Sequence, residues 1–111
     1  MRPITPVYVG TAQGEGDRPE QLAFRARRGR CYRAFAVGAP NVIDLDVAVY
    51  DPRGNLAAGD VSPDRFPVVP PRAPLCVDRS GVYRLVVGVT RGHGDYRLQI
   101  WGTDASDDDD E

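Results

Sequence analysis

The amino-acid sequence predicts an all-β protein, an antiparallel β-sandwich or jelly roll of about eight short strands with no significant helix. Its 12 glycines and 10 prolines leave no stretch free of both that is longer than the eleven residues from Asn41 to Asp51. Inside a helix each glycine costs about 1 kcal/mol and each proline about 3 kcal/mol relative to alanine. Valine, which favours pleated strands, occurs 14 times, against six leucines and three isoleucines. Apolar and polar residues also alternate with the period of two that half-buried strands show.

The candidate strands recur about every ten residues, with turn-forming residues between them, which is typical of sandwiches and jelly rolls. Prolines crowd residues 67–74, so the strands there are expected to be edge strands or bulged, since proline cannot donate to a central ladder. The predicted strands, in chain order, are Pro6 to Val9, Gln21 to Arg27, Cys31 to Val37, Asp44 to Asp51, Asn55 to Ala58, Phe66 to Val69, Pro74 to Val77, Val82 to Thr90 and Asp95 to Trp101.

Two of the connections are predicted to be hairpin turns. Residues 51–54 read Asp-Pro-Arg-Gly, which are the residues that a type I turn favours. Residues 91–94 read Arg-Gly-His-Gly, a glycine-flanked turn of hairpin length between the last two strands. On these strands the apolar phase predicts an inward face, made of Leu45, Val47, Val49, Tyr83, Leu85, Val87, Val89, Tyr96, Leu98 and Ile100.

The length of 111 residues fits one domain, a single β-sandwich over residues 1–103, followed by an acidic tail over residues 104–111 that is expected to be disordered. The tail holds six of the 16 acidic residues, so the other ten, set against 14 arginines, leave the body with a charge of +4. The arginines cluster at the end of one predicted strand, in the turn and in the next strand. This cluster is interpreted as a solvated hairpin end, with a polyanion site or a docking patch for the tail as alternatives; it consists of Arg25, Arg27, Arg28, Arg30 and Arg33.

Several classes of function are not expected. The basic residues do not form a stripe with interleaved aromatic residues, so no nucleic-acid partner is predicted. No apolar run reaches 18 residues, so no membrane span is predicted, and the first residues lack the apolar core of a signal peptide. The single histidine, His93, sits between two glycines, and there is no G-x-S-x-G elbow. The chain is therefore predicted not to be an enzyme.

The two cysteines, Cys31 and Cys76, have no metal-type spacing, so zinc is not expected. They are interpreted as a disulfide, which requires an oxidising compartment. The alternative is a pair of buried thiols that act as small apolar side chains.

A longer pattern of strands and turns, from about Leu22 to Trp101, resembles the bacterial pre-peptidase C-terminal domain. It is carried by Gly29-x-Cys31-Tyr32, by Asp44-Leu45-Asp46-Val47-x-Val49-Tyr50-Asp51-Pro52-x-Gly54, by Asp60, by Gly81-x-Tyr83-x-Leu85-x-Val87 and by Gly94-x-Tyr96-x-Leu98. The resemblance implies a jelly-roll accessory domain of an exported bacterial protease or other multidomain protein, located outside the cell or in the cell envelope. It also implies a role in secretion, surface attachment or substrate binding, and relatives in collagenases bind calcium. The cysteine pair departs from the family pattern.

The residues themselves present two candidate sites. Asp44 and Asp46 share one face of a strand, and Asp60 and Asp64 lie in a following loop, so these carboxylates are a candidate calcium site or, alternatively, caps and Asx turns. No other cofactor is predicted. Tyr50 and Trp101 fall out of phase with the apolar face and, with Arg25 and Arg27, are the candidate binding surface for a protein or polysaccharide. The alternative function is a structural or assembly module that pairs with neighbouring chains through sheet edges and the Arg and Asp segments.

Overall fold

The computed structural model describes residues 1–12, 14, 17–60 and 65–103. The predicted tail, residues 104–111, and Asp64 therefore lie outside the described residues. The described residues form ten β-strands and no helix. The strands are β1 (Arg2–Pro3), β2 (Tyr8–Ala12), β3 (Glu20–Ala26), β4 (Cys31–Gly38), β5 (Val42–Tyr50), β6 (Leu56–Gly59), β7 (Val68–Val69), β8 (Leu75–Cys76), β9 (Gly81–Gly92) and β10 (Gly94–Gly102).

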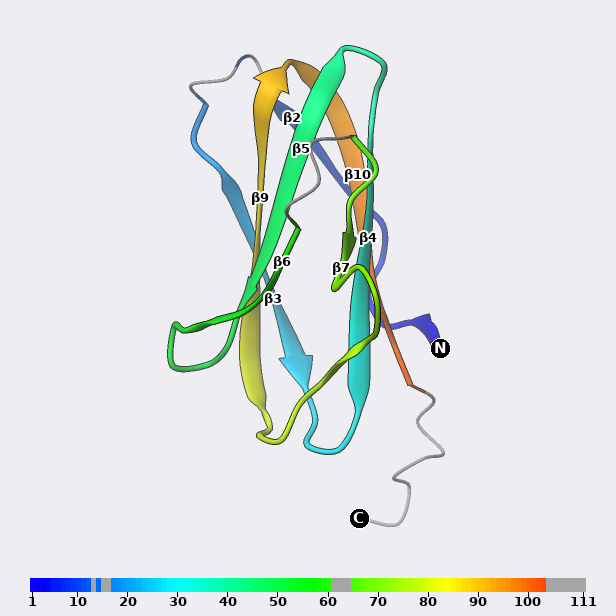
Figure 1. Ribbon diagram of the computed structural model, residues 1–111, viewed down its shortest axis with the longest axis vertical. Helices are drawn as coiled ribbons and strands as arrows, with labels where there is room; N and C mark the ends of the chain where they lie inside the picture. Colours follow the sequence, from blue (N-terminus) through cyan, green and yellow to red (C-terminus); the bar gives the residue numbers. More distant parts are fainter. Residues whose placement is uncertain (13, 15–16, 61–64, 104–111) are drawn as a thin grey trace.

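The strands form two antiparallel sheets that pack face to face (Figure 1). One sheet has the order β1-β10-β4-β7, with β2 also paired to β10 and β8 also paired to β4. We call it sheet A. The other, sheet B, has the order β3-β9-β5-β6. The predicted all-β sandwich is confirmed, and the two-residue strands β7 and β8 lie at the edge of sheet A, as the prolines around them predict.

The core lies between the sheets and is made by alternate residues of the long strands. Along β5 and β9 every second side chain is buried, and Leu45, Leu85 and Val87 have no exposed surface. Each such side chain stabilises the fold by about 1.5–3 kcal/mol relative to an exposed one. All ten residues predicted to face inward are buried. The period of two therefore predicted which face of each of these strands is buried.

The predicted hairpin between β5 and β6 is confirmed. The backbone N–H of Gly54 donates to the carbonyl of Asp51 at 2.9 Å, which closes the turn. The Asp51 side chain also accepts hydrogen bonds from the backbone N–H groups of Arg53 and Asn55, each at 2.9 Å. The carboxylate of Asp51 thus replaces solvent for two turn amides, which explains the aspartate at this position.

The hairpin predicted at residues 91–94 is wrong. Strand β9 pairs with β3 and β5 in sheet B, whereas β10 pairs with β1, β2 and β4 in sheet A. His93 is the one residue between the two strands, and its backbone N–H donates to the carbonyl of Asn41 at 3.0 Å. Both strands bury one face, so a connection within a sheet and a crossing between sheets have the same local pattern. Gly92 and Gly94, with φ of 91° and 133°, make the sharp crossing possible.

The arginine-rich turn is likewise a crossing between sheets, so its interpretation as a hairpin end is wrong. Strand β3 belongs to sheet B and β4 to sheet A. The N–H of Arg30 donates to the carbonyl of Arg27 at 3.0 Å, and the N–H of Gly29 donates to Val77 at 2.9 Å. The turn is therefore held by the segment that follows β8.

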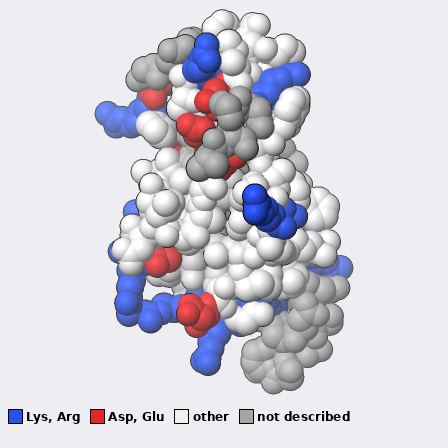
Figure 2. Space-filling view, viewed as in Figure 1, with Lys and Arg blue, Asp and Glu red and all other residues white. Residues whose placement is uncertain are grey.

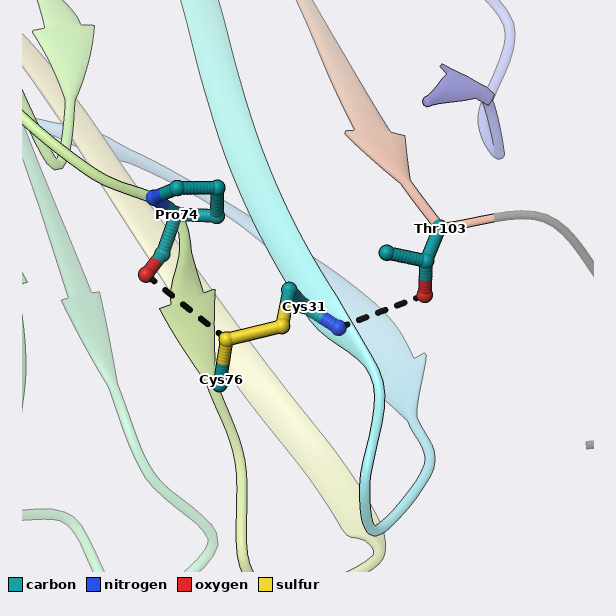
Figure 3. The surroundings of a disulfide bond; sticks show 4 residues. All are labelled: Cys31, Pro74, Cys76 and Thr103. Atoms are coloured by element: carbon teal, nitrogen blue, oxygen red, sulfur yellow. Dashed lines mark hydrogen bonds between the residues drawn. A yellow bond between two sulfur atoms is a disulfide. The ribbon is translucent and has the colours of Figure 1, made fainter. Parts of the chain in front are cut away.

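Cys31 and Cys76 form a disulfide, as predicted. They are directly opposite each other where the short strand β8 pairs with β4 (Figure 3). Only two residue pairs join these strands. The covalent link therefore anchors a segment that has few backbone hydrogen bonds of its own.

Candidate functional site

A hollow lies on the outer face of sheet B, where the turn between β5 and β6 borders it. Its volume is about 590 Å³. Its lining comes from β3, β5, β9 and that turn, and consists of Gln21, Tyr50, Asp51, Pro52, Arg53, Gly54, Val82, Arg84 and Val86. We call it the Tyr50 groove.

Strand register explains how the Tyr50 groove is assembled. Tyr50 lies opposite Arg84, and Val86 lies opposite Gln21, so side chains from three neighbouring strands point to the same face. The Tyr50 ring and the valines provide apolar surface, and Arg53 and Arg84 are exposed cations. Asp51 is engaged in the turn. The groove therefore offers one ring, an apolar floor and two guanidinium groups as donors.

Trp101 lies on the opposite side of the sandwich. It is on the outer face of sheet A, where its ring packs edge-on against Phe35 with 6.2 Å between the ring centres. Its indole N–H donates to Gln99 Oε1 at 3.1 Å. The sequence placed both Tyr50 and Trp101 outside the core, and both are half-buried on outer faces. Because they belong to different sheets, one ligand cannot stack on both.

Of the other predicted acidic residues, Asp44 and Asp60 lie near Asp46, at the end of the sandwich where β5 begins. Burial raises the pKa of Asp46, and the charges of Asp44 and Asp60 raise it further. The Thr90 side chain, through a hydrogen bond, acts in the opposite direction. Pairing of β6 with β5 brings Asp60 close, since its backbone N–H donates to Val47 at 3.0 Å. Figure 2 shows acidic side chains gathered toward the upper end of the visible face.

The fit of this acidic group to a cation is partial. Asp44 Oδ1 is buried and has no hydrogen-bond partner in the described structure, as an oxygen meant for a cation would be. Calcium takes six to eight oxygens, and carboxylates are its usual side-chain ligands. Within residues 1–12, 14, 17–60 and 65–103, however, no three His, Cys, Asp or Glu side chains form a group that could hold a metal ion. Asp64, the fourth predicted ligand, lies outside those residues.

The other two predicted binding residues, Arg25 and Arg27, line a separate cleft of about 510 Å³ beside the edge strand β3. Both side chains are exposed. This arginine cleft shares no residue with the Tyr50 groove. Its described lining consists of Ile4, Thr5, Ala23, Phe24, Arg25, Arg27, Arg30, Tyr32 and Thr103.

Sequence reasoning missed three residues of the Tyr50 groove and one polar link between the sheets. Gln21 and Arg84 become neighbours of Tyr50 only through strand register, for which the sequence alone holds no signal, whereas Arg53 reaches the groove through the predicted β5–β6 turn. Glu20 on β3 accepts hydrogen bonds from Tyr8 and from Tyr96, the latter at 3.0 Å. Burial and, to a smaller extent, the hydrogen bond to Glu20 raise the pKa of Tyr96.

The fold is shared with a solved structure, the pre-peptidase C-terminal domain of collagenase from Bacillus anthracis. The two chains superpose with a TM-score of 0.62 over 86% of this chain and 88% of the other, at 20% sequence identity. The fold implied by the sequence resemblance is thereby confirmed. The sequence matches no protein-family model and no curated protein. Nothing in the described part of the chain forms a helix long and apolar enough to span a membrane.

Proposed function

We propose that this chain is a non-catalytic accessory domain of an exported multidomain protein, such as a protease, and that it binds a polypeptide in the Tyr50 groove. The observation that carries the proposal is the groove itself, where an aromatic ring, an apolar floor and two exposed arginines line one hollow on a sheet. The shared fold with a collagenase domain supports an accessory role beside a catalytic domain. The disulfide supports a location outside the cell or in the cell envelope.

A polypeptide suits this groove better than a polysaccharide. Sugar rings stack on aromatic faces, and Tyr50 is the one aromatic residue among the nine that line the groove. Trp101 is on the other face of the sandwich and adds nothing to it. Arg53 and Arg84 are suited to donate hydrogen bonds to the carboxylates and carbonyls of a peptide. We therefore assign the groove to an extended peptide with an acidic residue near an apolar one.

The lack of catalysis is proposed from the placement of the groups that acid–base chemistry needs. His93, the single histidine, is exposed on the crossing between β9 and β10. Asp51, a carboxylate in the groove lining, caps the turn with two hydrogen bonds and so is not held as a free base.

Replacement of Tyr50 by alanine is expected to weaken peptide binding about tenfold or more, because aromatic anchors at the centre of a site carry a large share of its affinity. The test is an array of immobilised peptides that vary acidic and apolar residues, with affinities of the best peptides measured by fluorescence anisotropy. Trp101→Ala is the matched control, since it removes a half-buried aromatic residue from the opposite face. Equal loss in both variants, or retained affinity in Tyr50→Ala, would contradict the assignment.

A second element of the proposal is that calcium stiffens the end of the sandwich where β5 begins and β6 ends, through Asp44, Asp46 and Asp60, with Asp64 as a further ligand. It is supported by the unpartnered, buried Oδ1 of Asp44 and by the raised pKa of Asp46, since a cation would relieve the repulsion between these carboxylates. The resemblance to domains with calcium-binding relatives supports it as well.

Calcium is expected to raise the melting temperature by about 10 °C when present at a hundred times its dissociation constant, which corresponds to about 2.7 kcal/mol. Asp46→Asn should abolish this gain. In EDTA the same variant should melt slightly higher than the wild type at pH 7. Folding raises the pKa of the Asp46 carboxyl above 3.8. The stabilisation that comes from this pKa shift is therefore complete below pH 3.8 and is lost as the pH rises through the folded-state pKa.

The measurement is a thermal melt of both proteins in millimolar calcium and in EDTA, repeated between pH 4 and 7. Asp95→Asn serves as the control, because this exposed aspartate lies on β10 in the other sheet. If calcium does not change the melting temperature of the wild type, the calcium proposal is wrong and the three carboxylates are structural residues.

A further inference from the structure

The charged side chains that line the arginine cleft are all positive. Three arginines line it, and none of the other described residues in its lining is acidic. Arg25 and Arg27 are exposed at the end of β3, which is an edge strand of sheet B. The rest of the lining is apolar, aromatic or hydroxyl-bearing. Such a surface attracts a ligand that carries several negative charges close together.

The last described residue of the chain belongs to the same cleft. The backbone N–H of Thr103 donates to the carbonyl of Cys31 at 3.0 Å. In the other direction, the N–H of Cys31 donates to Thr103 Oγ1 at 3.3 Å, as Figure 3 shows. These two bonds hold Thr103 beside the residue that follows Arg30. The chain therefore continues into residues 104–111 from a fixed point in the wall of the arginine cleft.

The sequence after that point is complementary in charge. Residues 104–111 carry six carboxylates, whereas the preceding residues carry a net charge of +4. Eight residues reach at most about 26–29 Å when extended, which is enough to pass along a cleft that begins at their own attachment point. Because the segment is tethered there, its local concentration at the cleft is in the millimolar range or above.

From this juxtaposition we infer that the arginine cleft is a binding site for clustered carboxylates and that its occupant is the acidic segment 104–111 of the same chain. The contacts are between guanidinium groups and carboxylates, the pairing that Arg makes best. Because the arginines are exposed, the attraction is screened by salt, with a Debye length of about 10 Å at 0.1 M. The inference does not depend on the Tyr50 groove, which is lined by other residues.

The test uses the full-length chain and a variant of equal length with Asn for the five aspartates of residues 104–111 and Gln for Glu111. The probe is a fluorescein-labelled peptide with the sequence of residues 103–111. We expect the neutralised variant to bind the peptide at least tenfold more tightly than the wild type, whose cleft is already occupied. Binding should weaken at least tenfold between 50 and 200 mM salt.

The arginines are tested in the neutralised background. Arg25→Gln with Arg27→Gln should reduce peptide binding at least tenfold, whereas Arg72→Gln with Arg97→Gln, two exposed arginines elsewhere, should leave it unchanged. Melting curves of all variants establish that they are folded. Equal peptide affinity in the wild type and the neutralised variant would overturn the inference. The inference would also be overturned if the neutralised variant did not bind the peptide. It would be overturned as well if the wild type bound the peptide more weakly than the neutralised variant only at concentrations where the chain dimerises.

Discussion

Replacing both cysteines with serine is expected to lower the free energy of unfolding by about 4 kcal/mol. The disulfide joins Cys31 and Cys76 across 45 positions of sequence, and the chain-entropy model gives about this value for a loop of that length. The loop closed by the disulfide contains β7 and β8, which pair with β4 over only two residue pairs each, so few backbone hydrogen bonds hold this segment without the covalent link. For a domain of this size the melting temperature should fall by about 15 °C or more.

The measurement is urea unfolding of the oxidised wild type, of the wild type in dithiothreitol and of the Cys31→Ser/Cys76→Ser variant. The reduced wild type and the variant should have the same midpoint, and dithiothreitol should not affect the variant. A variant as stable as the oxidised wild type would show that β8 is held by its noncovalent contacts alone.

Gly92→Ala is expected to destabilise the fold by about 3 kcal/mol. Gly92 has a φ of 91°, and a Cβ there would overlap the carbonyl oxygen of Asn41 and lie 2.8 Å from the backbone nitrogen of Ile43. A non-glycine residue at such a φ costs about 1–2 kcal/mol, and forcing backbone atoms apart adds a similar amount. The substitution thus acts at the crossing that carries the chain from sheet B to sheet A.

The matched control for this prediction is Gly54→Ala. Gly54 has nearly the same φ, 90°, but nothing lies within 4 Å of the position a Cβ would take. Its substitution should therefore cost about 1 kcal/mol from the backbone alone. Chemical denaturation of the two variants measures the difference. Equal costs would mean that the close approach of Gly92 to Asn41, and with it the geometry of the crossing, is not as described.

The sequence was sufficient to predict which residues of a strand face the core, because the period of two is a local property. Leu45, Val47 and Val49 alternate with Asp44, Asp46 and Tyr50, and the structure buries the first set. The β5–β6 turn was predictable for the same reason, since the carboxylate of Asp51 acts on amides only two and four residues away.

The partners of a strand are a different matter, because they depend on residues distant in sequence. The connections at Gly29 and at His93 have the length and glycine content of hairpin turns, yet each joins two sheets. The phase of the strands predicts that Tyr50 and Trp101 lie outside the core, but it does not say which sheet each belongs to. Their placement on opposite faces, and the neighbours of Tyr50 in its groove, follow from sheet assignment and register.

The central claim, that the Tyr50 groove is the binding surface, is tested most directly by NMR titration of the ¹⁵N-labelled chain with the tightest peptide from the array. Amide shifts are expected in the β5–β6 turn, at Tyr50 and along Val82, Arg84 and Val86 of β9. They should be absent from the outer face of sheet A around Phe35 and Trp101. Shifts confined to that opposite face, or no peptide that binds at all, would contradict the claim.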